Sequence, residues 1–219
     1  MKSISLFFVW ILFFILQTIH TYGKSKPNII YLMLDEWGYF ESGHMGSTDL
    51  KTPNIDQFAS EGMRFTNAYA GAPVCGPTRC SLLTGLHAGN MSVRGNNEYS
   101  PIRADETTLA TVLKTKGYAT GGFGKWGIGG RGTTGVPEKH GFDLFFGYYD
   151  QVHAHTFYPS YLIRNSEEVP LPGNSGNSFY EGKTHAQLEI FKESISFIKK
   201  HKDEPFFCYL PWTPPHGLW

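Results

Sequence analysis

The sequence contains little cysteine and carries no net charge. Its 219 residues include three cysteines, too few for a fold built on disulfides, and we expect Cys80 and Cys208 to be buried thiols. Nineteen basic residues balance nineteen acidic ones, which excludes the basic surface that a general nucleic-acid binder needs. Hydrophobic residues make up 41% of the chain, so the composition is that of a folded protein, and the length predicts one domain or part of one.

The N-terminus lacks an apolar run of membrane-spanning length. The apolar stretch over residues 4–16 follows Lys2 and is shorter than the roughly 20 residues that a spanning helix needs. A positive start, a short apolar run and a polar exit predict a signal peptide over residues 1–23, with an uncleaved anchor as the alternative. We therefore expect a mature chain over residues 24–219 without a stable membrane span, exported to a periplasm, the extracellular space or a secretory-pathway lumen.

Apolar runs and helical patterns alternate along the rest of the chain. Strands are predicted over residues 28–35, 64–69, 119–123 and 205–210. Helices are predicted over residues 53–62, in the segment before Gly117, and over residues 184–201, the last with an apolar stripe of Leu188, Phe191, Ile195 and Ile198. The continuous apolar run over residues 28–35 indicates a strand buried on both faces, as in parallel sheets. This alternation predicts a layered α/β fold.

Two acidic residues, Asp35 and Glu36, follow the first predicted strand. Ligands of open α/β sheets bind beyond the carboxyl ends of the strands, so these carboxylates lie where a site is expected. Their hard oxygen atoms suit Ca²⁺ or Mg²⁺. The alternative is a solvated strand end without a ligand.

A second cluster of chemically capable residues surrounds Cys75. Pro77 suits a first helical turn and Gly85 suits a helix end, so a short helix is predicted with Cys75 at or just before its N-terminus. Backbone N–H groups at such a terminus favour an anion, and Arg79 lies one turn further on. The pattern predicts a nucleophile beside an oxyanion-binding pocket, with a buried structural cysteine as the alternative.

The same cluster carries a family resemblance. The sulfatase signature, Cys-x-Pro-Ser/Thr/Ala-Arg with a Leu-Thr-Gly tail, resembles Cys75-Gly76-Pro77-Thr78-Arg79 followed by Leu82-Leu83-Thr84-Gly85. Other strings resemble family landmarks on both sides of the signature: Thr52-Pro53-Asn54-Ile55-Asp56, Gly62-Met63-Arg64-Phe65-Thr66-Asn67-Ala68-Tyr69, Gly124-Lys125-Trp126, His140-Gly141-Phe142-Asp143 and Pro214-Pro215-His216. The resemblance covers residues 26–219.

The resemblance implies a type I sulfatase of the alkaline-phosphatase-like superfamily. Its fold would be a three-layer α/β/α sandwich with a mostly parallel central sheet, incomplete here at the C-terminus. The substrate would be the sulfate ester of an aryl or carbohydrate compound, either a small molecule or a polysaccharide. In that family a separate formylglycine-generating enzyme oxidises the signature cysteine to formylglycine, so Cys75 would carry this group. One hydroxyl of the hydrated aldehyde attacks sulfur, and the other allows sulfate to leave.

The resemblance also implies roles for individual residues. Arg79 would hold the formylglycine, Lys125 would neutralise sulfate oxygens, and His216 would assist at the leaving oxygen. Lys125 and His216 are therefore expected both in catalysis and in substrate binding. A calcium ion would polarise the sulfate group. Its implied ligands are Asp35, Glu36 and the modified Cys75.

The chain departs from the family pattern in three ways. Glu36 stands where the family usually has a second aspartate, and Gly127 stands where it has a histidine that contacts the formylglycine hydroxyl. We hypothesise that His153 or His155 binds substrate or replaces that histidine, and their alternating spacing predicts a shared strand face. The family's later Asp-Asn calcium ligands and second active-site lysine would lie beyond Trp219, so the chain is expected to be a fragment of a longer sulfatase.

Two other functions compete with sulfate-ester hydrolysis. A phosphate or phosphonate ester hydrolase of the same superfamily would use a similar pocket, because sulfate and phosphate are both tetrahedral oxyanions. A non-catalytic secreted protein that binds sulfated glycans, or an inactive fragment, would keep the fold without the chemistry. The cysteine in the signature favours the sulfatase, since typical phosphatases of the superfamily use serine or threonine there.

Overall fold

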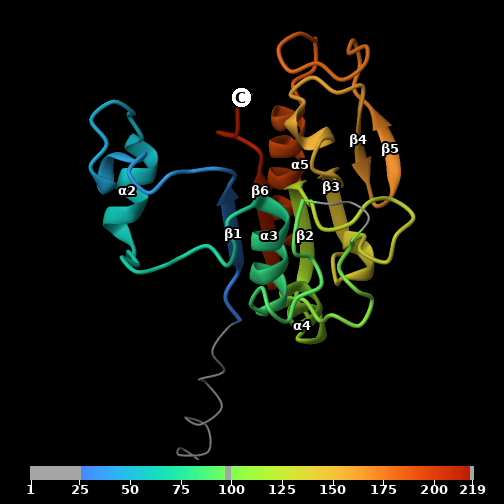
Figure 1. Cartoon of the computed structure of the whole chain (residues 1–219), viewed down its shortest axis with the longest axis horizontal. Coiled ribbons are helices and arrows are strands. Elements are labelled where there is room, and N and C mark those ends of the chain that lie inside the picture. Colours follow the sequence, from blue (N-terminus) through green and yellow to red (C-terminus); the bar gives the residue numbers. More distant parts are fainter. Residues whose placement is uncertain (1–25, 97–99, 218–219) are drawn as a thin grey trace, which may run out of the picture.

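A computed structural model describes residues 26–96 and 100–217, in which six strands form one sheet (Figure 1). The strands are β1 (Ile29–Leu34), β2 (Ala119–Lys125), β3 (Leu144–Tyr148), β4 (Tyr161–Arg164), β5 (Glu167–Pro170) and β6 (Phe206–Trp212). Their order across the sheet is β1-β6-β2-β3-β4-β5. The pairings from β1 to β3 are parallel, whereas β4 and β5 are added antiparallel.

Helices cover both faces of this sheet. The α-helices are α2 (Pro53–Glu61), α3 (Cys75–Thr84), α4 (Leu109–Thr115) and α5 (Ala186–His201). Short 3₁₀ helices are η1 (Gly43–Met45), η2 (Pro137–Lys139) and η3 (His153–His155). Helices α3 and α4 lie on one face and α5 on the other (Figure 1). The predicted layered α/β sandwich with a mostly parallel sheet is therefore confirmed.

Each face of the sheet has its own apolar core. Under α3 and α4 the buried side chains include Leu83, Trp126 and Phe145. Under α5 they include Phe123 and Ile190. Cys80 and Cys208 belong to these cores as free thiols, as predicted. Phe123 in β2 and Trp126, just after β2, thus belong to different cores on opposite faces of the sheet. This is expected for a central strand with helices on both sides.

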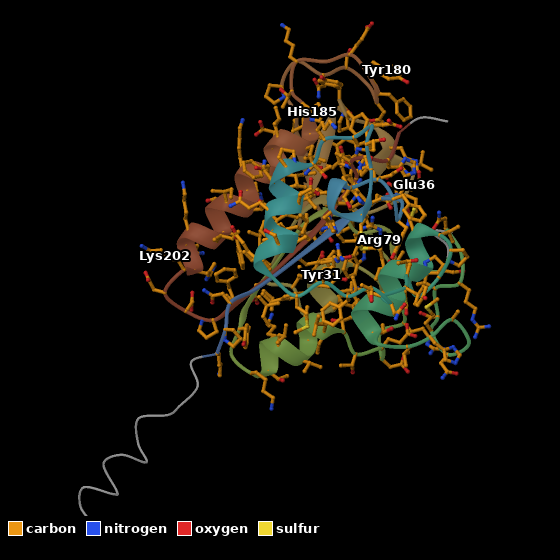
Figure 2. The ribbon with its side chains drawn as sticks, turned by 90° about the vertical axis from the view of Figure 1, so that its left-hand side faces the viewer. Tyr31, Glu36, Arg79, Tyr180, His185 and Lys202 are labelled. Carbon is orange, nitrogen blue, oxygen red and sulfur yellow. The ribbon has the colours of Figure 1, made fainter. Side chains whose placement is uncertain are left out.

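The predicted burial of β1 on both faces is wrong. β1 lies at the edge of the sheet, and Ile30, Tyr31 and Leu32 are exposed (Figure 2 faces this edge and labels Tyr31). An apolar run predicts a strand, but its burial depends on what covers it, and among the described residues nothing pairs with the outer side of β1.

The predicted strand over residues 64–69 is also wrong, because this segment is irregular. Phe65 and Tyr69 are exposed there, and no described strand pairs with the segment. The preceding α2 forms where it was predicted, with Pro53 in its first turn, but none of its described residues is buried. Local helix propensity was therefore sufficient to predict α2, whereas a strand also requires a neighbouring strand to pair with.

The buried face of α5 differs from the predicted one. The buried residues are Ala186, Ile190, Ser194 and Phe197, whereas Leu188 and Phe191 of the predicted stripe are exposed. The buried positions are offset from the predicted stripe by one or two residues, which rotates the buried face by roughly 100° or more around the helix. The small side chains of Ala186 and Ser194 allow close approach to the sheet. The apolar period alone therefore did not identify the buried face.

The predicted signal peptide over residues 1–23 lies outside the described residues. Among the helices that the structure describes, none combines the length and the apolar character needed to cross a membrane.

Candidate active site

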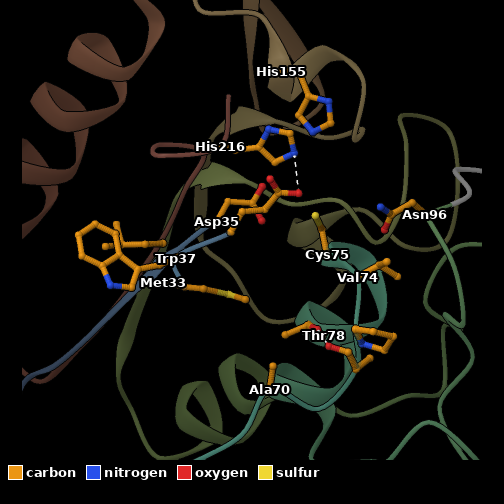
Figure 3. Close-up of a pocket in the computed structure, with 14 residues that line it drawn as sticks. Met33, Asp35, Trp37, Ala70, Val74, Cys75, Thr78, Asn96, His155 and His216 are labelled. Atoms are coloured by element: carbon orange, nitrogen blue, oxygen red, sulfur yellow. Dashed lines mark hydrogen bonds and ion pairs between the residues drawn. The ribbon is translucent and has the colours of Figure 1, made fainter. Parts of the chain in front are cut away.

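The candidate site lies where the carboxyl ends of three neighbouring strands meet the N-terminus of α3 (Figure 3). Asp35 directly follows β1, Lys125 is the last residue of β2, and His216 comes four residues after β6. Cys75 is the first residue of α3. The residues that follow parallel strands all lie at the carboxyl-end edge of the sheet, so side chains far apart in sequence come together there.

A buried ion cluster forms the floor of the site. The ammonium group of Lys125 donates to Oδ2 of Asp35 at 2.7 Å, and the guanidinium of Arg79 lies 3.2 Å from Oδ1. A second guanidinium N–H donates to the carbonyl oxygen of Lys125 at 2.6 Å. Lys125 and Arg79 are fully buried and Asp35 is nearly so. One carboxylate between two cations leaves the cluster with a net positive charge, which suits an anionic substrate.

The protonation of Asp35 is fixed by this cluster. Burial opposes ionisation and acts to raise the pKa of Asp35, but the charges of Arg79 and Lys125 outweigh it and hold the pKa below its usual value. Asp35 is therefore ionised at neutral pH. The two cations in turn have a buried counter-ion, without which they would be costly to keep away from water.

The Cys75 thiol is half-buried at the mouth of α3 and points toward Asp35 (Figure 3). Burial raises the pKa of Cys75, and the nearby charge of Asp35 raises it further against the opposing effect of Lys125. Nucleophilic cysteines have lowered pKa values because the thiolate is the reactive form. The unmodified thiol is thus poorly suited to attack, despite its position at a helix N-terminus.

The two histidines nearest the ion cluster stack on each other. The rings of His155 and His216 lie 4.0 Å apart at an angle of 21°. Nε2 of His155 lies 3.1 Å from the Lys125 ammonium, and Nε2 of His216 lies 3.2 Å from Oε1 of Glu36. Burial, followed by the charge of Lys125, lowers the pKa of His155 to about 4. His155 is therefore neutral at pH 7 and accepts a hydrogen bond from Lys125.

His153 does not lie in the site. Its ring packs edge-on against Tyr148 at 5.0 Å and in a tilted arrangement against Tyr161 at 4.7 Å, and the residue is buried in the protein. The predicted shared strand face is wrong, because His153 and His155 belong to the 3₁₀ helix η3. Residues two apart on a 3₁₀ helix point in different directions. The structure therefore brings His155, but not His153, to the other predicted residues.

A pocket of about 300 Å³ opens above the cluster. Its polar lining comprises Asp35, Glu36, Cys75, Thr78, Asn96, His155 and His216. Glu36 has a positive φ of 58°, a conformation that costs a non-glycine residue about 1 kcal/mol or more and that recurs at functional sites. The backbone is thus held in an unfavourable conformation directly after β1, at the residues that carry the two carboxylates.

The donor set of the pocket fits part of a calcium shell. Ligand atoms of Asp35, His155 and His216 lie within 4.8 Å of one another, as do those of Glu36, Cys75 and His216. Calcium binds six to eight oxygen ligands, so the carboxylates of Asp35 and Glu36 suit it, whereas the histidines do not. These two carboxylates could hold the ion together with oxygen ligands from outside this set.

Two polar residues in or next to the site were not predicted from the sequence. The side-chain oxygen of Asn96 accepts from the backbone N–H of Gly76 at 2.8 Å and so anchors the first turn of α3. The side-chain amide of Gln151 donates to the carbonyl of Gly127 at 2.9 Å. Both are single polar residues in loops, and no spacing or motif in the sequence distinguishes them from other loop residues.

Comparison with known proteins agrees with this geometry. The family model described as Sulfatase matches residues 27–219. The chain belongs to the sulfatase family. Arylsulfatase A of Bos taurus is 41% identical over 85% of this chain and 41% of its own length. The human N-acetylgalactosamine-6-sulfatase is 33% identical over 89% of this chain and 40% of its own length.

A solved structure has a similar fold. Ps i-CgsB in complex with k-i-k-neocarrahexaose matches this sulfatase chain with a TM-score of 0.76 and 28% identity. The match covers 88% of this chain and 46% of that structure. This sulfatase chain therefore spans less than half the length of these relatives. The resemblance seen in the signature around Cys75 is confirmed.

Proposed function

We propose that this chain carries the oxyanion-binding part of a sulfuric ester hydrolase. The observation that carries the proposal is the cluster of Asp35, Lys125 and Arg79 directly beneath Cys75, with a net positive charge and an open pocket above it. Cations that are buried and already oriented stabilise developing negative charge more strongly than flexible surface groups do. The cluster is thus organised before substrate arrives.

Each side chain of the site has a chemical task under this proposal. Lys125 would neutralise sulfate oxygens, and Asp35 and neutral His155 fix the position of its ammonium group. Arg79 holds the residue at position 75 from one helical turn away. His216 is a candidate general acid at the leaving oxygen, because its Nε2 faces the pocket beside Glu36. His153, buried behind Tyr148, has no such task.

Cys75 is proposed to act as formylglycine rather than as a thiol. The raised pKa of Cys75 supports this, since the protonated thiol is a poor nucleophile. The hydrated formylglycine would supply a hydroxyl nucleophile whose partner hydroxyl permits release of sulfate. A formylglycine-generating enzyme is then a required partner during maturation. Asp35 and Glu36 would hold a calcium ion, which would polarise the sulfate group.

The proposed substrate is a sulfated carbohydrate or an aryl sulfate. One relative is named N-acetylgalactosamine-6-sulfatase, and a similar protein, Ps i-CgsB, was solved in complex with k-i-k-neocarrahexaose. We also propose that residues 1–23 are a signal peptide, because Lys2 is followed by a short apolar run over residues 4–16, and that residues 24–219 are a portion of the catalytic domain, because the family model matches residues 27–219.

Two measurements on the protein expressed with a formylglycine-generating enzyme test the proposal. The first is the mass of the peptide that contains Cys75, which falls below the mass of the cysteine form when formylglycine is present. The second is hydrolysis of an aryl sulfate, with and without a calcium chelator and with an aryl phosphate in parallel. We expect formylglycine, sulfate release and loss of rate on chelation. Faster phosphate release would favour the phosphatase alternative.

A matched pair of variants makes the test specific to position 75. Cys75→Ala removes the proposed nucleophile, whereas Cys80→Ala changes a fully buried cysteine on the same helix that does not line the pocket. We expect turnover to vanish in Cys75→Ala and to persist per folded molecule in Cys80→Ala. Sulfate release by protein whose Cys75 is an unmodified thiol would refute the proposed mechanism.

A further inference from the structure

Gln151 reaches the N-terminus of α3 through a single backbone carbonyl. Its side-chain N–H donates to the carbonyl oxygen of Gly127 at 2.9 Å. That oxygen faces the first turn of α3, because a Cβ atom on Gly76 would lie 3.2 Å from it. Gly76 directly follows Cys75, so the amide of Gln151 is one carbonyl group away from the backbone that carries the proposed nucleophile.

The space that the Gln151 amide occupies exists only because residue 127 has no side chain. Gly127 has a φ of 73°, in the left-handed region that favours glycine. A Cβ atom there would collide with Nε2 of Gln151 and would lie 3.0 Å from its Cδ and 3.4 Å from Cδ of Arg79. The amide therefore fills the volume of a residue-127 side chain and lies beside the stem of Arg79.

Both Gln151 and Arg79 retain unused hydrogen-bonding atoms at this contact. Oε1 of Gln151 and Nε of Arg79 are buried without a hydrogen-bond partner among the described residues. Leaving a buried polar atom unpaired costs about 1–3 kcal/mol, so its retention calls for an explanation such as a catalytic role. The unpaired acceptor of Gln151 is a second observation, beside its contact with Gly127, that packing alone does not explain.

We propose that Gln151 is a positioning residue for the sulfatase reaction, with Gly127 as its structural counterpart. The amide N–H holds the Gly127 carbonyl against the first turn of α3, and the amide fills the space beside the Arg79 stem that a side chain at position 127 would take. Together they fix residue 75 and Arg79 relative to the substrate sulfur. The inference rests on the proposed function, because positioning is defined by the reaction it serves.

A structural role and a positioning role predict different kinetics. Loss of positioning leaves substrate binding by the ion cluster nearly intact but misaligns residue 75, so kcat falls while KM changes little. Misplacement of a reacting group by about 1 Å can cost about 100-fold in rate. We therefore expect Gln151→Ala to lower kcat by about 10- to 100-fold. A purely structural role would lower the melting temperature and leave kcat per folded molecule unchanged.

The experiment is a double-mutant cycle in the full-length enzyme on Gln151→Ala, Gly127→Ala and their combination. Gln57→Ala is the matched control, because Gln57 also makes one side-chain hydrogen bond, at 2.8 Å to Glu61, but is exposed on α2. kcat and KM for an aryl sulfate, the melting temperature and the fraction of formylglycine at position 75 are measured for each variant. Rates are normalised to the formylglycine fraction, so incomplete maturation does not mimic loss of positioning.

We expect Gly127→Ala to lose both activity and stability, because its Cβ collides with the Gln151 amide. The double variant, freed of that collision, should melt at a higher temperature than Gly127→Ala alone, whereas Gln57→Ala should match the wild type. An active wild type with unchanged kcat in Gln151→Ala overturns this proposal and leaves the proposed function standing. A correctly matured wild type without sulfatase turnover overturns the proposed function and this inference with it.

Discussion

The buried contact between Lys125 and Asp35 allows a sharp test of how the site is stabilised. The substitution is Lys125→Met, which keeps most of the aliphatic volume and removes only the ammonium group. Its partner Asp35 is 4% exposed and loses a hydrogen bond of 2.7 Å, while Arg79 remains at 3.2 Å. Removing one partner of a buried ion pair typically costs about 3–5 kcal/mol. Because one cation remains, we expect the lower end, about 3 kcal/mol of unfolding free energy.

Lys114→Met is the matched control for this prediction. Lys114 also contacts an aspartate, Asp143, at 2.6 Å, but both side chains are nearly half exposed. Water screens such a pair, so the same substitution should cost at most about 1 kcal/mol. The two variants share the residue change, the partner type and nearly the same distance. They differ in burial, which is the quantity under test.

The measurement is urea unfolding of wild type and both variants in calcium-free buffer at pH 7 and at lower pH. The pKa of Asp35 is lowered in the folded protein, so its stabilisation is present above the unfolded pKa of about 3.9 and is lost as the pH falls through the folded pKa. The gap between wild type and Lys125→Met should therefore shrink below about pH 4. Equal costs for Lys125→Met and Lys114→Met at pH 7 would refute the reasoning.

Three further predictions concern stability away from the pocket. Burial acts to raise the pKa of Glu106, but hydrogen bonds from Ser92 and from the backbone N–H of Arg103 outweigh it and lower the pKa. Glu106→Gln should therefore destabilise the protein at pH 7, and the difference should fade below about pH 4 in pH-dependent unfolding. Ile190→Ala, on the buried face of α5, should cost about 2–5 kcal/mol in urea unfolding, against less than about 0.5 kcal/mol for exposed Leu188→Ala. Gly85→Ala should cost about 1–2 kcal/mol through its φ of 71° alone, since nothing lies within 4 Å of an added Cβ, and the melting temperature would show it.

Local signals in the sequence were sufficient for the elements that carry the site. Pro77 and Gly85 marked the start and end of α3, and the structure places Cys75 at its first residue. The positions of Asp35 and His216 after apolar runs predicted that both lie at the carboxyl edge of a parallel sheet. These predictions succeeded because helix termini and the edge rule depend on short stretches of chain and on the handedness of strand connections.

Predictions that depended on distant partners were less successful. The exposure of Ile30 and Leu32 could not be read from their apolar character, since it depends on the edge position of β1. The apolar stripe predicted for α5 was the wrong one, and packing against the sheet selects the face with Ile190 instead. Hydrophobic periodicity shows that a face will be buried somewhere, but the packing partner decides which face.

The loop after β3 separates the predictions that local sequence signals can support from those that depend on distant partners. His153 and His155 were interpreted by strand alternation, yet the side chain of Asp150 accepts from the His153 backbone N–H at 2.7 Å and starts a turn. An aspartate three residues before a candidate is a local signal of this kind, and it would have favoured a turn over a strand. The turn places His153 in the core and His155 beside Lys125, so the two histidines have different surroundings although they are only two residues apart. No such local signal exists for Gln151, because its contact with Gly127 depends on how the loop crosses the end of β2.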